Sequence, residues 1–336
     1  MDESSKYPFV SIIVFGLNEE KNLHDTFDAI MNIDYPKEKY ELIYVDNGSK
    51  DESVAIAKNY TESVFIEDKG NPSPAQARNR GLLEANFDII HFIDGDIVID
   101  KNYLKKAVKK LEEMDIHAVY GYLDEKSKKG VNNILLTHWK DKKEGFSNAV
   151  GGGGTFRRNA LLSIDGNDER IRRGAETELG ERFRKAGFKI WYMNCKMGIH
   201  DYGVKNVWDL VKTYYIDGQS KSHIMMLSGK SDFIKTSNRT AINNILFCMF
   251  FLGLFIISAF FVGYYSLLVF FIVFYGYFFI NYIMIKKIFS FKKLSYFFLM
   301  HNFKYITFWG QLVFFIKIIF NPSYRKLKIL PKSKLS

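Results

Sequence analysis

Apolar and polar positions alternate in a regular order over the first 94 residues of the chain. Short runs of consecutive apolar residues favour buried strands, whereas apolar residues three or four positions apart favour helices. The predicted helix from Glu19 to Met31, for example, carries Leu23, Phe27 and Ile30 on one face. The pattern predicts strands at 9–17, 41–46, 63–67 and 88–94 and helices at 19–31, 51–60 and 74–86. This alternation indicates an α/β fold with a Rossmann-like, mostly parallel sheet and right-handed crossovers.

Polar residues follow three of these strands at the point where each strand ends. They are Asn18, Glu19, Asp46, Asn47, Asp94 and Asp96. Parallel α/β sheets bind ligands beyond the carboxyl ends of their strands, so we expect these side chains to lie on one rim. No glycine fingerprint of the form GxGxxG follows the first strand, which argues against a nicotinamide or flavin enzyme.

Asp94 and Asp96 flank Gly95 at the end of the apolar strand 88–94. On an extended segment, side chains two positions apart point the same way, and two such carboxylates repel each other unless a cation lies between them. The pair therefore predicts a cation site, and the residues alone leave the identity of the cation open. The alternative is that the two acids only cap a turn before a helix near Asn102.

A long apolar segment occupies the C-terminal third of the chain. No charged residue occurs from Ile245 to Ile285, which is long enough for two membrane spans joined by a turn at 262–266. Lys286 and Lys287 follow at once and indicate the cytoplasmic side. The first eight residues do not resemble a signal peptide, so we expect the part before the spans to face the cytoplasm. The pattern predicts a multi-pass protein of the cell membrane.

The end of the chain is apolar but interrupted by charges. Within 294–320, the stretch 305–316 is free of charge, which is short for a span and favours an interfacial amphipathic helix before a basic cytosolic tail. A third span with an external tail is the alternative. The predicted domains are thus residues 1–242, two transmembrane helices at 243–286, and the interfacial part at 287–336.

Charge is distributed unevenly between these parts. The formal net charge is +10, but residues 243–336 hold 11 Lys or Arg and no Asp or Glu, which leaves 36 basic and 37 acidic residues in 1–242. The predicted soluble domain is nearly neutral, so we expect no nucleic-acid partner, and the basic end suits membrane lipids. The two cysteines, Cys195 and Cys248, are far apart and fit a reducing compartment.

Six motifs occur in the order and approximate spacing of family 2 glycosyltransferases. They are "FGLNEEKNL", "VDNGSKDES", "GNPSPAQARNRGL", "FIDGD", "GGGGTFRRNAL" and "ETELGERFRKAG". Each motif alone is weak, but six in register are specific. The chain therefore resembles this family from about residue 8 to 225. The resemblance implies a GT-A fold, inversion at the transferred sugar, a nucleotide-sugar donor, and Mg²⁺ or Mn²⁺ as cofactor.

The resemblance also implies donor-binding residues. Asn18 and Glu19 match the first strand-end loop, and Asp46 matches the acid after the second strand, which together hold the base and ribose. Arg78 matches a basic residue near the base and pyrophosphate, and Asp94 matches a donor-sugar contact. Simpler explanations are open: Glu19 suits the first turn of a helix, Asp46 suits a turn, and Arg78 suits a solvated helix face.

Metal-binding and catalytic residues follow from the same resemblance. Asp94 and Asp96 match the metal-binding pair, and His200 falls where some relatives place a histidine near the metal or diphosphate. Glu176 aligns with the general base for the acceptor hydroxyl, and Glu178 is its competitor. A lone histidine often only satisfies hydrogen bonds in the core, and the two glutamates also suit a solvated helix start. The glycines at 151–154 are expected to approach the acceptor sugar.

The chain departs from the family pattern at Leu17 in place of Tyr, Asn47 in place of Asp, and Ala175–Glu176 in place of Glu–Asp. It also lacks the Q-x-x-R-W motif of processive members. We expect a non-processive enzyme that glycosylates a lipid-linked glycan, namely a polyprenyl-linked saccharide, in surface polysaccharide biosynthesis. The alternatives are a polyprenyl-phosphate glycosyltransferase of the dolichol-phosphate-mannose synthase type, a nucleotidyltransferase, and a membrane scaffold with a degenerate site.

Overall fold

The computed structural model describes residues 7–70, 72–126, 142–151, 153–171, 174–200 and 207–228, with six single positions between 306 and 317. The chain forms two compact units, of which one contains the elements up to residue 200 and the other contains helix α9 (Val207–Ser228). The predicted membrane hairpin at 243–286 lies outside the described residues. Among the helices that are described, none is both long and apolar enough to cross a membrane.

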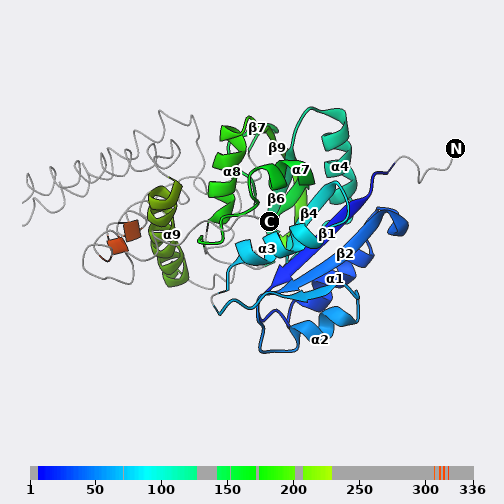
Figure 1. Ribbon diagram of the computed structural model, residues 1–336, viewed down its shortest axis with the longest axis horizontal. Helices are drawn as coiled ribbons and strands as arrows, with labels where there is room; N and C mark the ends of the chain where they lie inside the picture. Colours follow the sequence, from blue (N-terminus) through cyan, green and yellow to red (C-terminus); the bar gives the residue numbers. More distant parts are fainter. Residues whose placement is uncertain are drawn as a thin grey trace, which may run out of the picture. The chain divides into compact units, whose positions relative to one another are not determined.

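Nine described strands of the first unit form one sheet with the order β3-β2-β1-β4-β8-β6-β9-β5, and β7 pairs with β9 (Figure 1). The strands are β1 (Val10–Gly16), β2 (Tyr40–Asp46), β3 (Val64–Ile66), β4 (Ile89–Asp94), β5 (Ile97–Ile99), β6 (Ala118–Glu125), β7 (Gly145–Ser147), β8 (Gly154–Arg157) and β9 (Ile190–His200). Strands β1 to β4 pair in parallel, as the sequence predicts.

The prediction of a mostly parallel sheet is wrong for the second half of the sheet. Strand β8 is antiparallel to both β4 and β6, and β5 and β7 are antiparallel to β9. The β6–β9 pair is again parallel, so this half is mixed. The regular strand–helix alternation ends at residue 94, and the later strands are no longer joined by uniform crossovers.

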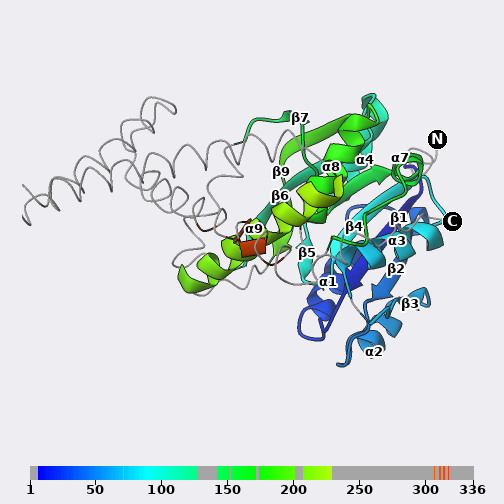
Figure 2. The same ribbon diagram turned by 60° about the vertical axis from the view of Figure 1, so that its left-hand side comes forward.

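Helices cover both faces of the sheet. They are α1 (Leu23–Met31), the 3-10 helix η2 (Lys37–Lys39), α2 (Ser53–Lys58), α3 (Pro74–Glu84), α4 (Tyr103–Glu113), α7 (Arg158–Ser163) and α8 (Ala175–Lys185). Strand β1 explains the layers, because its alternate residues enter two separate cores. Val10, Ile12 and Val14 pack with α1 and α4, whereas Ile13 and Phe15 pack with α3, α7 and α8. Figure 2 shows these helices beside the strands of the sheet.

Helix α3 lies unusually close to the sheet at Gly81. A Cβ atom at this position would lie 2.3 Å from Cγ2 of Ile13 on β1, so a side chain there would force the helix away. The helix begins with a capping box, in which the Ser73 side chain accepts from the backbone N–H of Gln76 and the Gln76 side chain accepts from that of Ser73. These contacts fix the helix that carries Arg78.

Helix α1 begins at Leu23, four residues later than the sequence predicts. Asn18 has a left-handed backbone with φ of 58°, and the Glu19 carbonyl accepts from the N–H groups of Asn22 and Leu23. Glu19 therefore lies in the turn before the helix rather than in its first turn. The predicted explanation of Glu19 as a first-turn acid does not hold.

Candidate active site

Parallel pairing brings the carboxyl ends of β1, β2 and β4 to one edge of the sheet (Figure 1). Gly16 on β1 lies beside Asp46 on β2, and Phe15 lies beside Asp94 on β4. The turn Gly95–Asp96 follows directly, and its Gly95 N–H donates to the Phe15 carbonyl. The prediction that these residues share one rim is confirmed.

Arg78 occupies the centre of this edge. Its side chain is only 4% exposed, and its guanidinium lies 4.7 Å from the centre of the Phe15 ring. Its Nη2 lies 2.9 Å from Oε1 of Glu176 and 3.7 Å from Oδ1 of Asp94. Burial opposes the charge of Arg78, but Glu176 and Asp94 outweigh it and raise the pKa of the guanidinium. The alternative of a solvated helix face is therefore wrong for this residue.

The surroundings of Asp94 disfavour its ionised form. Burial raises the pKa of Asp94 to about 7; the Arg78 guanidinium opposes this rise, and the charges of Glu176 and Asp96 add to it. The site therefore holds more negative charge than Arg78 alone neutralises. Asp94 does not cap the helix near Asn102, because β5 intervenes and Asp100 accepts the Asn102 N–H instead.

Asp96 and His200 form a second contact on the same rim. Oδ2 of Asp96 lies 3.1 Å from Nε2 of His200, which ends the neighbouring strand β9. Burial alone would lower the pKa of His200, but the hydrogen bond and charge of Asp96, with Asp94 behind it, raise it overall. Glu19 also belongs to this group, because burial raises its pKa and Asp96 adds to the rise. His200 thus contacts a predicted metal-binding acid.

Asp46 and Asn18 accept hydrogen bonds from the backbone of the loop after β2. Asp46 is buried, and its Oδ2 accepts from the N–H groups of Gly48 at 2.8 Å and Ser49 at 2.6 Å. The Asn18 side chain accepts from the N–H of Lys50 at 2.9 Å. Both residues therefore shape the loop after β2, in agreement with the turn-forming alternative for Asp46.

The two candidate bases at the start of α8 differ sharply in their environment. The side chain of Glu176 is 29% exposed and contacts Arg78 at the rim. The side chain of Glu178 is 4% exposed and forms a two-point ion pair with Arg182 one turn later. Arg182 in turn donates to the Ile164 carbonyl, so Glu178 ties α8 to the end of α7. Of the two glutamates, Glu176 is the one that the structure places beside Arg78.

Among the glycines at 151–154, the described ones allow strands of the sheet to approach each other closely. Gly153 and Gly154 have positive φ angles of 125° and 152°, and Gly154 opens β8. A Cβ at Gly154 would lie 3.1 Å from the Val119 carbonyl on β6. Close strand approach explains these glycines, and the predicted approach to an acceptor sugar stays a prediction.

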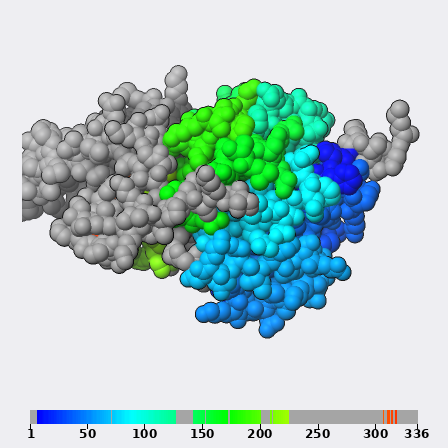
Figure 3. Space-filling model, viewed as in Figure 1, coloured from blue at the N-terminus to red at the C-terminus, as the bar shows by residue number. Residues whose placement is uncertain are grey.

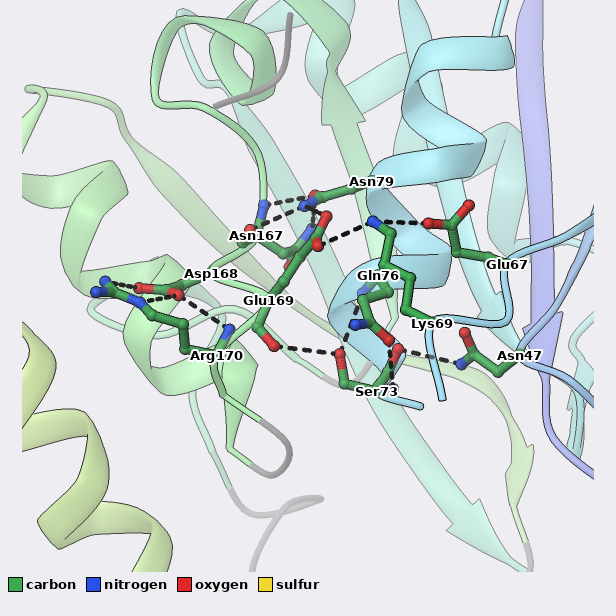
Figure 4. A network of polar contacts seen from close by, with 10 residues as sticks. All are labelled: Asn47, Glu67, Lys69, Ser73, Gln76, Asn79, Asn167, Asp168, Glu169 and Arg170. Carbon is green, nitrogen blue, oxygen red and sulfur yellow. Dashed lines mark hydrogen bonds and ion pairs between the residues drawn. The ribbon is translucent and has the colours of Figure 1, made fainter. Parts of the chain in front are cut away.

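A polar network that the sequence did not reveal lies next to this rim (Figure 4). It joins α3 and the loop after β3 to the segment 167–170 before α8. Asn79 is the sequence neighbour of Arg78 in the "ARN" motif, which was the only available signal. Figure 3 shows the two halves of this region, near residues 74–84 and 158–185, side by side on the molecular surface.

The predicted metal-binding residues are Asp94, Asp96 and His200. Their carboxylate and imidazole donors suit Mg²⁺ or Mn²⁺. Within the described residues, however, no three His, Cys, Asp or Glu side chains already form a metal-binding group. A small hollow of about 120 Å³ opens beside Asp96 and is lined by Asn22, Asp25, Val98, Lys126 and Ile199.

Comparison with known proteins decides the family. Residues 11–165 match the model of glycosyl transferase family 2. This part of the chain is a family 2 glycosyltransferase region. The match confirms the resemblance of the six motifs and favours a glycosyltransferase over the nucleotidyltransferase alternative.

The similarity to curated relatives extends over only part of each protein. The glycosyltransferase AglE of Haloferax volcanii is 33% identical over 126 residues, which are 36% of this chain and 41% of AglE. A dolichyl N-acetyl-α-D-glucosaminyl phosphate 3-β-D-2,3-diacetamido-2,3-dideoxy-β-D-glucuronosyltransferase of Methanococcus voltae is 26% identical over 204 residues, 54% of this chain and 64% of that protein. The chain thus spans less than two thirds of either relative.

A solved structure agrees with the fold. The mannosyltransferase PcManGT from Pyrobaculum calidifontis, in complex with GDP-Man and Mn²⁺, has a TM-score of 0.54 at 18% identity. The similarity covers 69% of this chain and 68% of PcManGT. At this identity it supports the fold alone, which is a GT-A-like α/β fold with a mixed sheet.

Proposed function

We propose that this family 2 protein transfers a sugar from a nucleotide-sugar donor to a lipid-linked saccharide, with inversion at the sugar. The observation that carries the proposal is the group of acidic side chains around Arg78 at the carboxyl edge of the sheet. Asp94 and Glu176 both contact this buried guanidinium, and Asp96 contacts His200 beside them. Among these groups Arg78, Asp94 and His200 have shifted pKa values, and such groups at a ligand-binding edge favour a catalytic centre over a scaffold.

The reaction assigns a separate task to Glu176. An oxygen of the acceptor hydroxyl attacks the anomeric carbon, the bond from that carbon to the diphosphate oxygen breaks, and the nucleoside diphosphate leaves with the bonding electrons. The hydroxyl proton passes to the Glu176 carboxylate, which acts as the general base. Arg78 holds Glu176 at 2.9 Å and presents its positive charge to the leaving diphosphate. Glu178 is engaged with Arg182 and has no part in this step.

The donor set fits a divalent metal ion. Asp94 and Asp96 supply hard oxygen ligands. Burial raises the pKa of Asp94, the nearby charges of Glu176 and Asp96 add to the rise, and a cation at this point would favour the ionised carboxylate. His200 beside Asp96 is a further ligand. When bound, Mg²⁺ or Mn²⁺ neutralises charge on the diphosphate. Asn18, Glu19 and Asp46 lie at the ends of β1 and β2, where we place the nucleotide.

A lipid-linked acceptor follows from the uncharged stretch 245–285, which is long enough to hold the enzyme at a membrane. An acceptor that diffuses in the same bilayer meets an anchored enzyme readily. The relative from Methanococcus voltae, named for transfer to a dolichyl N-acetyl-α-D-glucosaminyl phosphate, supports this class. We place the catalytic unit on the cytoplasmic side because Lys286 and Lys287 follow the predicted spans.

The test is release of nucleoside diphosphate from a panel of nucleotide-sugars by the full chain in detergent. We expect turnover with Mg²⁺ or Mn²⁺, loss of turnover with EDTA, and a loss of at least about 100-fold in Asp96→Asn. Asp115→Asn is the matched control, because this acid is 82% exposed and pairs only with the surface residue Lys189 in the described part. Equal turnover with and without EDTA contradicts the metal role, and no turnover with any donor contradicts the function.

A further inference from the structure

The segment 167–171 lies between α7 and the helix that carries Glu176, and side chains of other segments hold it in place. Ser73 and Lys69 contact Glu169, and another of these side chains is that of Asn79 of α3, which is 2% exposed. Its Oδ1 accepts from the Asn167 N–H at 2.7 Å, and its Nδ2 donates to the Asn167 carbonyl at 2.9 Å (Figure 4). An amide side chain therefore pairs with both polar groups of one backbone residue.

A third contact extends this clamp. Nδ2 of Asn79 also donates to Oε1 of Glu169 at 3.0 Å, and the other oxygen of Glu169 accepts from Lys69 at 3.2 Å. Lys69 is about half exposed and also pairs with Glu67 after β3. The network thus has a buried end at Asn79 and an exposed end at Lys69 (Figure 4).

The clamped segment is itself well tied together. Both oxygens of the buried Asp168 contact the guanidinium of Arg170, and the Ile171 N–H donates to the Asp168 carbonyl at 3.0 Å. These bonds tie Asp168, Arg170 and Ile171 together, and α8 begins at Ala175, four positions after Ile171.

Adjacent residues of α3 thus hold both ends of the same connection. Arg78 contacts Glu176, and Asn79 contacts Asn167, which precedes Glu176 by nine positions. We propose that Asn79 is a positioning residue that sets the place of Glu176 relative to Arg78. This inference rests on the proposed function, in which Glu176 receives the acceptor proton. Asparagine suits the task because aspartate lacks the donor that the Asn167 carbonyl and Glu169 require.

The first test needs no substrate. Hydrogen–deuterium exchange is measured in the full chain for peptides covering Asn167–Ile171 and Gly174–Leu179. In Asn79→Ala we expect faster exchange in both peptides, whereas the control Lys69→Gln, which breaks only the exposed end of the network, leaves the second peptide unchanged. Unchanged exchange at the start of α8 in Asn79→Ala overturns the proposal.

The second test uses a double-mutant cycle in sugar transfer, with each rate referred to the folded fraction. A misplaced base costs rate but not donor affinity, so Asn79→Ala should lower kcat about 10- to 100-fold and leave donor binding within twofold. In the Glu176→Gln background the same change should cost less than twofold, because the group it positions is gone. Losses that multiply in the double variant overturn the proposal.

A variant of similar shape covers the case in which Asn79→Ala does not fold. Asn79→Asp keeps the size and the Oδ1 acceptor but turns a carboxylate toward Glu169, and Glu169→Gln restores a donor at that contact. We expect the combined variant to recover part of the kcat lost in Asn79→Asp. No recovery contradicts the assigned contact. Absence of transfer in the unmodified protein instead counts against the proposed function.

Discussion

Arg78 joins the two acids on which the site depends. A buried guanidinium needs carboxylate partners, and Asp94 and Glu176 come from segments about 80 positions apart in the chain. The sequence could predict Asp94, Asp96 and Arg78 because each lies in a local motif. It could not reveal that Glu176 rather than Glu178 meets Arg78, because that depends on how α8 is rotated against α3. The clamp by Asn79 was missed for the same reason.

The buried His91 leads to a prediction about how the stability of the fold depends on pH. Nδ1 of His91 lies 3.0 Å from the Gly154 carbonyl inside the sheet, and burial lowers the pKa of His91 to about 4. The unfolded chain, with a pKa near 6.5, then binds the proton first as pH falls. Its contribution to folding is complete above about pH 6.5 and is lost as pH falls toward about 4, a decrease on the order of 3 kcal/mol.

Urea unfolding at pH 7 and pH 4.5 measures this effect as the difference between the unmodified chain and His91→Gln. We expect the free energy of unfolding to fall more steeply with decreasing pH in the unmodified chain, since glutamine does not titrate. Other titrating groups cancel in the comparison. Parallel pH dependence in the two proteins would show that His91 contributes nothing.

The local sequence pattern determines the position of some helices and strands, whereas tertiary contacts determine the position of others. The strands up to β4 were predicted within two residues, because β-branched and apolar runs bounded by turn residues are strong signals. The α1 boundary was misplaced by four residues, because the left-handed Asn18 inserts a turn that periodicity does not encode. The antiparallel strands β5, β7 and β8 are three or four residues long. Their sequences are too short to predict a strand, because the strand forms only through pairing with neighbouring strands.

Helix α8 leads to a prediction at the scale of elements. Glu178 is buried against Arg182, so Glu178→Gln leaves that guanidinium without its carboxylate and should lower the free energy of unfolding by about 1–3 kcal/mol. Glu84→Gln is the matched control, because it breaks the Arg80–Glu84 pair of α3, which is partly exposed, and should cost at most about 0.5 kcal/mol. Urea denaturation measures both. Unchanged stability with a large loss of turnover would instead identify Glu178 as the base.

The whole chain combines a nearly neutral catalytic unit with a basic, apolar C-terminal part. This contrast supports membrane attachment, and the location of the chain's end tests it. Two spans within 243–286, as the sequence predicts, would return the chain to the side where it began, so a reporter fused after Ser336 should behave as cytoplasmic. A reporter fused before Met1 is the matched control for the opposite end. A reporter that is accessible only from outside at Ser336 would require an odd number of spans.

The central claim is that Glu176 receives the proton of the acceptor at a site centred on Arg78, and single-turnover sugar transfer tests it most directly. Glu176→Gln keeps the size and the hydrogen bond to Arg78 but removes basicity. The account predicts a transfer rate about 10²–10⁴-fold lower, with donor affinity, measured separately by equilibrium binding, nearly unchanged. A variant that transfers sugar as fast as the unmodified enzyme would contradict it.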